Sequence, residues 1–192
     1  LLAGAQGEQF ARKVYQSLFN SIGTLDPHSL TGKWYKVVTS PSVHQDLCSV
    51  AYYDLMEETK HTSLLSIREY FHLGDMKSEI LSVDGSVSQR GPDPGALLVD
   101  TGHDNDYCPY FIIKAGPIQQ VGEQYPYLVM SQMLKHPVMV YARDPLEFEE
   151  LYKGEVWSFL ESQNFLNTVT KHYSMVRAVN FTQCPHDFYR NL

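Results

Sequence analysis

The chain has 192 residues, of which 43% are hydrophobic and 19% are charged, and its formal net charge is −7. This length is enough for one domain with a substantial core. The acidic balance argues against non-specific nucleic-acid binding. No apolar run approaches the roughly 18 residues that a membrane-spanning helix needs, so a helical membrane protein is excluded.

The N-terminal segment carries two features. Leu1–Gln6 has leucines followed by small residues in an A-x-A arrangement, which suits the end of a signal peptide or a flexible N-terminus. Residues 8–22 predict an amphipathic helix, because apolar residues recur every four positions. That helix packs on the domain or offers a surface to lipid or a partner. We expect residues 1–25 to form a helical extension and residues 26–192 to form the main domain.

Short β-prone segments separated by turn signals follow the helix and predict strands. The expected strands are 34–43, 50–56, 62–71, 77–84, 96–100, 110–115, 127–134 and 137–143. The two prolines of Arg90–Gly95 place that segment in a loop. The spacing of these segments favours an antiparallel meander over βαβ units.

Helical periodicity returns after the eighth expected strand. Asp144 can cap a helix whose first residue is Pro145. One face of this helix is expected to be buried through Leu151, Val156, Phe159 and Leu160. A last strand is expected over residues 173–179. The order of elements predicts a mainly β protein, a closed eight-stranded antiparallel barrel with an N-terminal helix, a C-terminal helix and a ninth strand. A barrel of about eight strands can hold one small ligand.

Motifs in this pattern resemble those of a known family. Gly32-x-Trp34 matches the first motif of the lipocalins, and Tyr141–Pro145, which reads YARDP, matches their third. Cys48–Met56 and Gln183–Pro185 are similar to segments of apolipoprotein D. The chain therefore resembles extracellular lipocalins close to apolipoprotein D and plasma retinol-binding protein. It departs from them between the sixth and seventh strands, where Ala-Gly-Pro-Ile stands in place of a Thr-Asp-Tyr turn.

The resemblance implies how one end of the barrel is closed and which cysteines form a disulfide. Trp34 would lie across the closed end, after a turn at Gly32, and Arg143 would stack on it with a cation–π attraction of roughly 2 kcal/mol when desolvated. Cys48 and Cys184 would form a disulfide. Cys108 is then left over, and it is buried and inert, pairs with residues outside this sequence, or links chains.

The barrel interior is the expected ligand site. Alternate strand residues face inward, so counting back from Arg143 puts Tyr141 and Met139 inside, and the resemblance implies inward positions on other strands. The expected ligand contacts are Ala51, Tyr53, Leu65, Ile67, Tyr110, Ile112, Leu128, Met130, Met139 and Tyr141. Such walls suit a lipid, a fatty acid, or a sterol-like or retinoid-like molecule. The alternative is that these side chains fill a small core and leave no cavity.

Signals for catalysis are weak. The eight histidines show no H-E-x-x-H spacing, and no G-x-S-x-G or Gly-rich phosphate loop occurs. Asp100, Asp104 and Asp106 suggest either a cation loop or an acidic solvated turn, and the spacing, unlike that of an EF-hand, favours the turn. We therefore expect no enzymatic activity, no metal and no cofactor.

Two functions follow from these patterns. The first is a secreted lipocalin that binds and transports a small hydrophobic ligand. The alternative is an extracellular matrix or signalling protein that binds cell-surface or matrix partners through the N-terminal helix, the 90–95 loop and the acidic turn at 103–106. The glycosylation sequon at Asn180, the possible signal peptide and the odd number of cysteines favour an extracellular location.

Overall fold

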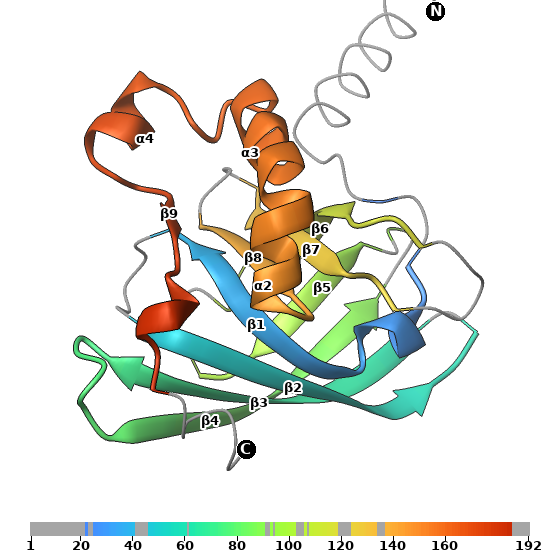
Figure 1. The fold of residues 1–192 in the computed structure, drawn as a ribbon. Coiled ribbons are helices and arrows are strands. Elements are labelled where there is room, and N and C mark those ends of the chain that lie inside the picture. Colours follow the sequence, from blue (N-terminus) through green and yellow to red (C-terminus); the bar gives the residue numbers. More distant parts are fainter. Residues whose placement is uncertain are drawn as a thin grey trace, which may run out of the picture.

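A computed structural model describes residues 22, 25–40, 46–60, 62–90, 93, 95–102, 106, 108–118, 124–133 and 137–185. Its strands are β1 (Gly32–Thr39), β2 (Asp46–Glu58), β3 (Thr62–Leu73), β4 (Ile80–Arg90), β5 (Ala96–Asp100), β6 (Tyr110–Ala115), β7 (Tyr127–Gln132), β8 (Val138–Ala142) and β9 (Arg177–Ala178). The sheet order is β2-β3-β4-β5-β6-β7-β8-β1-β9, with β1 also paired to β2. The first and eighth strands therefore join and close the barrel, as the sequence predicted (Figure 1).

The fourth strand differs from the prediction over residues 77–84. β4 is longer and later, and it pairs with β3 continuously, from His72↔Ile80 to Thr62↔Arg90. Its second half is rich in serine and contains Gly85, so its composition does not suggest a strand. The long partner strand β3 supplies the hydrogen bonds that extend it.

The helical segment after β8 begins as predicted. Asp144 Oδ1 accepts hydrogen bonds from the backbone N–H groups of Leu146 at 2.7 Å and Glu147 at 3.1 Å. The segment comprises α2 (Pro145–Glu147), the π-helical turn η3 (Phe148–Tyr152) and α3 (Lys153–Ser162). The expected burial of Leu151 is wrong, since its side chain is 61% exposed while Phe148 is buried. A π turn holds an extra residue, which rotates the apolar face relative to a regular helix.

The C-terminal segment also departs from the predicted strand over 173–179. Asn167 forms a capping box with Thr170 and begins a short helix, α4 (Thr168–His172), so only β9 remains extended. β9 pairs with Val38 and Thr39 of β1. The chain then reaches Cys184, which forms the predicted disulfide with Cys48 of β2.

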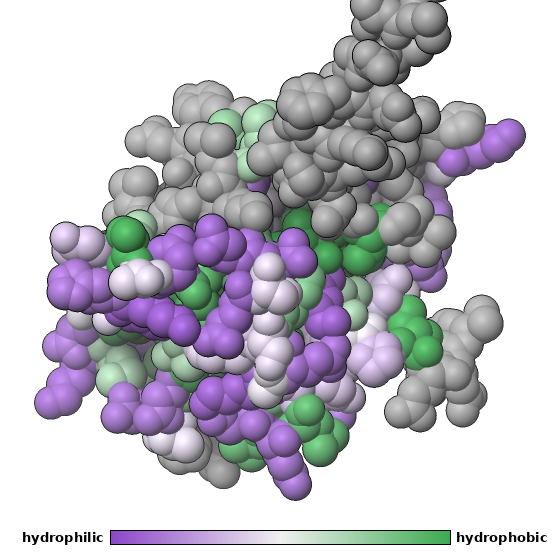
Figure 2. All heavy atoms as spheres, turned by 90° about the horizontal axis from the view of Figure 1, so that it is seen from above, coloured by the Kyte–Doolittle hydropathy of each residue, from purple (hydrophilic) through white to green (hydrophobic). Residues whose placement is uncertain are grey.

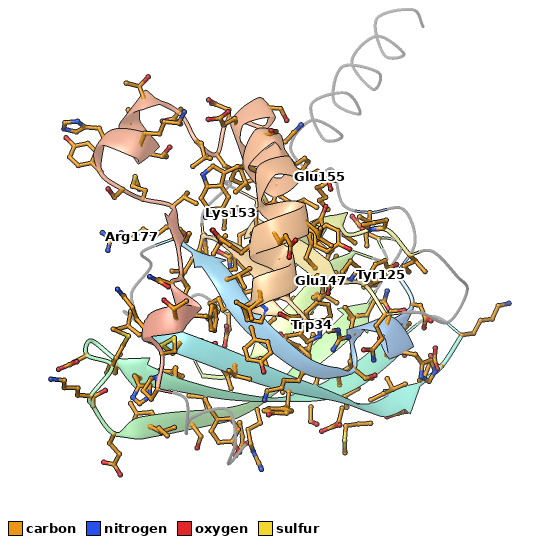
Figure 3. All side chains as sticks on the ribbon, viewed as in Figure 1. Trp34, Tyr125, Glu147, Lys153, Glu155 and Arg177 are labelled. Atoms are coloured by element: carbon orange, nitrogen blue, oxygen red, sulfur yellow. A yellow bond between two sulfur atoms is a disulfide. The ribbon has the colours of Figure 1, made fainter. Side chains whose placement is uncertain are left out.

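Two apolar clusters lie on opposite faces of the sheet. One fills the barrel interior around Trp34, and the other lies between the outer face of β1, β7 and β8 and the helix α3. Glu155 of α3 accepts a hydrogen bond from Tyr127 at 3.0 Å and pairs with Lys114 at 2.7 Å, which fixes the helix outside the barrel (Figure 3). The described residues on the face in Figure 2 are mainly hydrophilic, with apolar side chains in small separate groups.

Some predictions concern residues outside those described. The helix over 8–22 is one of them, apart from Ile22, whose N–H donates to the carbonyl of Ile112 at 2.9 Å. The segment Leu1–Gln6 is another. The division at residue 25 into an extension and a domain therefore stays a prediction.

Candidate ligand-binding site

One end of the barrel is closed by an indole and a guanidinium. The Arg143 guanidinium carbon lies 3.7 Å from the centre of the Trp34 ring. Trp34 is 1% exposed, and its Nε1–H donates to the carbonyl of Leu30 at 2.7 Å. Arg143 also donates to the carbonyls of Lys33 and Ser29, both at 2.9 Å. This arrangement leaves no room for a ligand at the Trp34 end.

The closed end depends on a residue without a side chain. Gly32 has a φ of +89°, a value that other residues rarely adopt, and a Cβ there would lie 3.2 Å from a guanidinium nitrogen of Arg143. Burial lowers the pKa of Arg143 to about 10. The attraction of the indole face and two carbonyl acceptors offset that cost of burial.

All ten predicted ligand contacts belong to the cluster inside the barrel. They divide into two groups by what they border. Ala51, Leu65 and Ile112 are fully buried, and Leu128 borders a void of only about 10 Å³ beside Trp34. The remaining six line a larger cavity, and these are Tyr53, Ile67, Tyr110, Met130, Met139 and Tyr141. Contact with a ligand stays a prediction for each of the ten.

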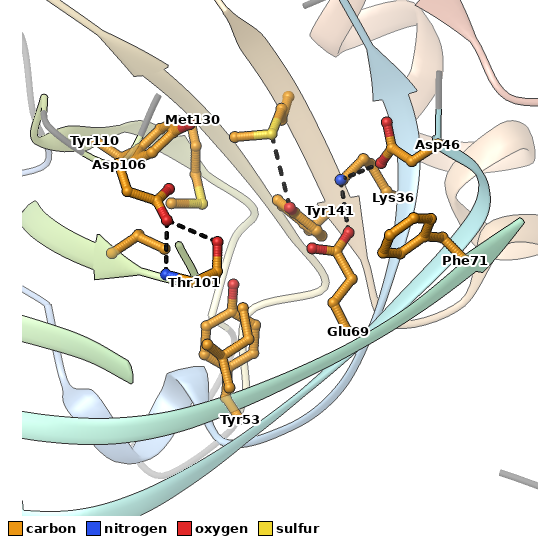
Figure 4. Close-up of a pocket in the computed structure, with 13 residues that line it drawn as sticks. Lys36, Asp46, Tyr53, Glu69, Phe71, Thr101, Asp106, Tyr110, Met130 and Tyr141 are labelled. Carbon is orange, nitrogen blue, oxygen red and sulfur yellow. Dashed lines mark hydrogen bonds and ion pairs between the residues drawn. The ribbon is translucent and has the colours of Figure 1, made fainter. Parts of the chain in front are cut away.

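This larger cavity has a volume of about 90 Å³ and lies at the end of the barrel away from Trp34, which we call the mouth (Figure 4). It settles the choice between a hollow and a filled interior in favour of a small hollow, because side chains fill the rest. Seven residues that the sequence analysis did not select complete its lining: Lys36, Asp46, Glu69, Phe71, Val99, Thr101 and Asp106.

An ion cluster around the buried Lys36 is the main polar feature of the cavity wall. Lys36 Nζ lies 2.6 Å from Asp46 Oδ2 and 2.6 Å from Glu69 Oε1. Glu69 Oε1 also accepts a hydrogen bond from Ser49. Burial opposes the charge on Lys36, but the two carboxylates outweigh it and raise the lysine pKa well above its usual value. Lys36 is therefore an ammonium inside the barrel.

Tyrosine rings form the other wall. Lys36 Nζ lies 5.6 Å from the centre of the Tyr141 ring, and the Tyr141 hydroxyl lies 3.7 Å from the sulfur of Met139. Burial raises the pKa of Tyr53, and burial with the nearby Asp106 carboxylate raises the pKa of Tyr110 to about 12. These phenols are therefore neutral at physiological pH and can donate or accept hydrogen bonds.

The acidic turn contributes to the mouth. Asp106 Oδ2 accepts hydrogen bonds from the backbone N–H of Thr101 at 2.6 Å and from its hydroxyl at 2.7 Å. Asp106 thus lines the cavity instead of standing only in solvent, as a solvated turn would. In the part of the chain that the structure describes, no group of three or more His, Cys, Asp or Glu side chains could hold a metal ion.

The sequence contains a pattern that could have predicted several of the cavity residues that were missed. The alternation that puts Trp34 inside also puts Lys36 inside, and the alternation of Leu65 and Ile67 continues to Glu69 and Phe71. The predicted interior residues end where each stripe becomes polar, at Lys36 on β1 and at Glu69 on β3. Asp46 had no such signal, because the positive φ of Cys48, +57°, interrupts the regular pattern of β2.

Two other residues named in the sequence analysis, Cys108 and Asn180, are not part of the cavity lining. Cys108 is free and exposed, so it is not the buried thiol that was one of the options. Asn180 is exposed, and its Oδ1 accepts hydrogen bonds from the N–H and hydroxyl of Thr182. Its use as a glycan acceptor stays a prediction. None of the helices among the described residues has the length and apolar character needed to cross a bilayer.

Solved structures that share this fold include a crustacean and an insect protein. Lobster apocrustacyanin A1 is 14% identical, with a TM-score of 0.56 over 85% of this chain and 84% of that chain. Insecticyanin from the tobacco hornworm Manduca sexta is 16% identical, with a TM-score of 0.50 over 86% of this chain and 85% of that chain. No curated protein matches in sequence. A family model described as a lipocalin domain matches residues 12–188, and the chain therefore belongs to the lipocalin family.

Proposed function

We propose that this lipocalin binds and carries a small ligand in the cavity at the mouth of its barrel, without a catalytic step. The observation that carries the proposal is a hollow of about 90 Å³ at one end of a barrel whose other end is plugged by Trp34 and Arg143. Apolar and aromatic walls supply the driving force for binding, at about 25 cal/mol for each Å² of apolar surface removed from water.

The cavity volume favours a small molecule. Sites for drug-sized ligands usually measure about 300–1,000 Å³, several times the hollow seen here. A fatty acid, sterol or retinoid would need the flexible side chains of Met130 and Met139 to move aside or would extend out of the mouth. A molecule about the size of one substituted ring fits these walls best.

Secretion is part of the proposal. The Cys48–Cys184 disulfide suits an oxidising compartment, where such bonds form and persist. A glycan on Asn180 would agree with the same route, since that side chain is exposed. A closer relation to apolipoprotein D and plasma retinol-binding protein depends on the segments around these two cysteines.

The alternative function, an extracellular interaction protein, depends mainly on residues outside those described. These are the segment 8–21, Gly91, Pro92 and Pro94 of the 90–95 loop, and residues 103–105. No contact of the described residues favours it over ligand carriage.

Calorimetric titration with 2-phenylethanol, a neutral single-ring probe, tests the proposal. We expect saturable binding of one molecule per chain. Met139→Trp fills the cavity and should weaken binding at least tenfold, whereas Met133→Trp makes the same change at a side chain that is 48% exposed and should leave binding unchanged. The absence of saturable binding, or an equal loss in both variants, would overturn the proposal.

A further inference from the structure

The cavity at the mouth is unusual among apolar pockets because it carries several charges. Among the described residues, three carboxylates line it, those of Asp46, Glu69 and Asp106, and one ammonium, that of Lys36. Three negative charges and one positive charge give this described part of the lining a formal charge of −2. Charges facing a partly desolvated space interact more strongly than charges in water. The field in the cavity therefore favours a cation and opposes an anion.

Lys36 does not make the site an anion receptor. Its ammonium already contacts two carboxylates at 2.6 Å, and its side chain is only 8% exposed. A ligand carboxylate that reached the third N–H of this ammonium would lie beside two carboxylates that repel it. One that displaced Asp46 or Glu69 would leave that group charged without its partner, which is costly. The cluster thus disfavours the anionic head of a fatty acid in the polar part of the cavity.

Glu69 keeps one oxygen for a ligand. Both of its contacts within the described part of the chain, from Lys36 and from the Ser49 hydroxyl, end on Oε1. The second oxygen, Oε2, belongs to a carboxylate that is 16% exposed and faces the cavity (Figure 4). A carboxylate oxygen in that position accepts a charge-assisted hydrogen bond from a cationic donor.

Two phenol hydroxyls point to a ligand independently of the charges. Tyr53 is 8% exposed and Tyr110 is 6% exposed, yet neither hydroxyl has a hydrogen-bond partner among the residues that the structure describes. Both side chains line the cavity, and Figure 4 shows the Tyr53 hydroxyl directed into it. Both hydroxyls border the cavity, so a molecule bound there can take the place of water and supply the partner that the described protein groups do not.

We propose that the cavity binds a small organic cation, a protonated primary amine attached to an apolar body about the size of one ring. The inference rests on the proposed function and names the ligand class of that site. An ammonium has three N–H donors, and the cavity offers three acceptors in Glu69 Oε2 and the hydroxyls of Tyr53 and Tyr110. The apolar body would lie against Ile67, Met130 and Met139.

The aromatic wall supports the same ligand. Tyr141 already has an ammonium 5.6 Å from its ring centre, that of Lys36, so this wall accepts a cation. Tyr53, Tyr110 and Phe71 add further ring faces to the lining. Rings and carboxylates together attract an organic cation more strongly than either group alone.

Three probes that share a ring and differ in charge test the inference by calorimetry at neutral pH: 2-phenylethylamine, 2-phenylethanol and phenylacetate. We expect the amine to bind at least about tenfold more tightly than the alcohol, because a charged hydrogen bond replaces a neutral one. Phenylacetate should show no saturable binding. Equal affinities for amine and alcohol, or tighter binding of phenylacetate, would overturn the inference.

Substitutions of single carboxylates test which side chains cause the tighter binding of the amine. Glu69→Gln should reduce the amine-to-alcohol affinity ratio about tenfold, while Glu57→Gln, an exposed change on β2, should leave it unchanged. If Glu69→Gln fails to fold, Asp106→Asn retains an oxygen that can accept from Thr101, and it should reduce the ratio about threefold. A ratio that neither change lowers would contradict the inference.

The outcomes separate the two proposals. Binding of 2-phenylethanol without a preference for the amine preserves the small-ligand carrier and removes the cationic ligand class. Binding of no probe removes both. A preference for the amine that Met139→Trp does not affect places a cation site elsewhere on the chain and overturns the inference.

Discussion

At the closed end of the barrel, Trp34 and its apolar neighbours fill the space until only about 10 Å³ is left, whereas at the mouth Lys36, Asp46 and Glu69 border about 90 Å³. Trp34 and Lys36 are only two residues apart and point to the same side of β1. Successive inward positions of the same strand therefore belong to the packed closed end and to the charged wall of the cavity. The closed end gains its stability from packing, while the mouth retains polar groups that packing alone does not require.

The comparison suggests different roles for the two ends. A buried ion cluster adds little stability relative to apolar side chains of the same shape, because removing its charges from water is costly. Its position in the wall of the cavity at the mouth instead matches recognition of a ligand. Packing at the closed end and a covalent link near the mouth then supply the stability.

The largest expected effect concerns that covalent link. The Cys48–Cys184 disulfide closes a loop with a sequence separation of 136 residues and starts beside Ser49 of the ion cluster. Replacing both cysteines by alanine should lower the free energy of unfolding by about 5 kcal/mol in the chain-entropy view, measured by urea denaturation. Cys108→Ala, at a free exposed thiol, is the control and should change it by less than about 0.5 kcal/mol. Equal free energies of unfolding for the two variants would show that the disulfide does not stabilise the protein.

Removing the plug should have the next largest effect. Trp34→Ala deletes a side chain that is 1% exposed and leaves Arg143 buried without its aromatic partner. The free energy of unfolding should fall by about 4 kcal/mol. Trp157 is only partly buried on α3, and Trp157→Ala should cost less than half as much. A larger loss of unfolding free energy for Trp157→Ala would show that packing of α3 stabilises the fold more than the closed end does.

The ion cluster should give the smallest of the three stability changes. Lys36→Met leaves the carboxylates of Asp46 and Glu69 buried together, and the free energy of unfolding should fall by about 3 kcal/mol at neutral pH. The triple variant Lys36→Met, Asp46→Asn, Glu69→Gln removes all three charges and should recover more than half of that loss. No recovery would mean that the cluster contributes to stability as a unit.

The effect of Lys36→Met on the free energy of unfolding should also depend on pH. The folded-state pKa of Lys36 is raised above its ordinary value of 10.5. Its contribution to stability is therefore complete below about pH 10.5 and is lost as the pH rises through the folded-state pKa. The difference in unfolding free energy between the native chain and Lys36→Met should narrow at higher pH, as followed by denaturation at a series of alkaline pH values. A gap that widens there would contradict the role assigned to this lysine.

Local patterns were enough to predict the barrel. Alternating strands, the Gly32-x-Trp34 motif and the Asp144-Pro145 helix start each act within a few residues, and the structure shows all three. The disulfide followed from a family resemblance, because spacing alone cannot say which cysteines approach one another.

Other features depend on contacts between distant segments. The length of β4 comes from pairing with β3, and the phase of the helical segment comes from a π turn that no local residue preference predicts. The charged cavity belongs to the same group, since Lys36, Asp46 and Glu69 come from three different strands and meet only when β1, β2 and β3 pair.

The sequence by itself determined that side chains alternate between the two faces of each regular strand, because alternation is a property of the local backbone. Counting along the eighth strand placed Met139 and Tyr141 inside, and the family resemblance implied the inward side of the other strands. Only the tertiary structure decided which inward positions fill the barrel and which surround a hollow. That outcome depends on the volumes and charges of side chains that meet across the barrel, and a pattern read along one strand does not contain them.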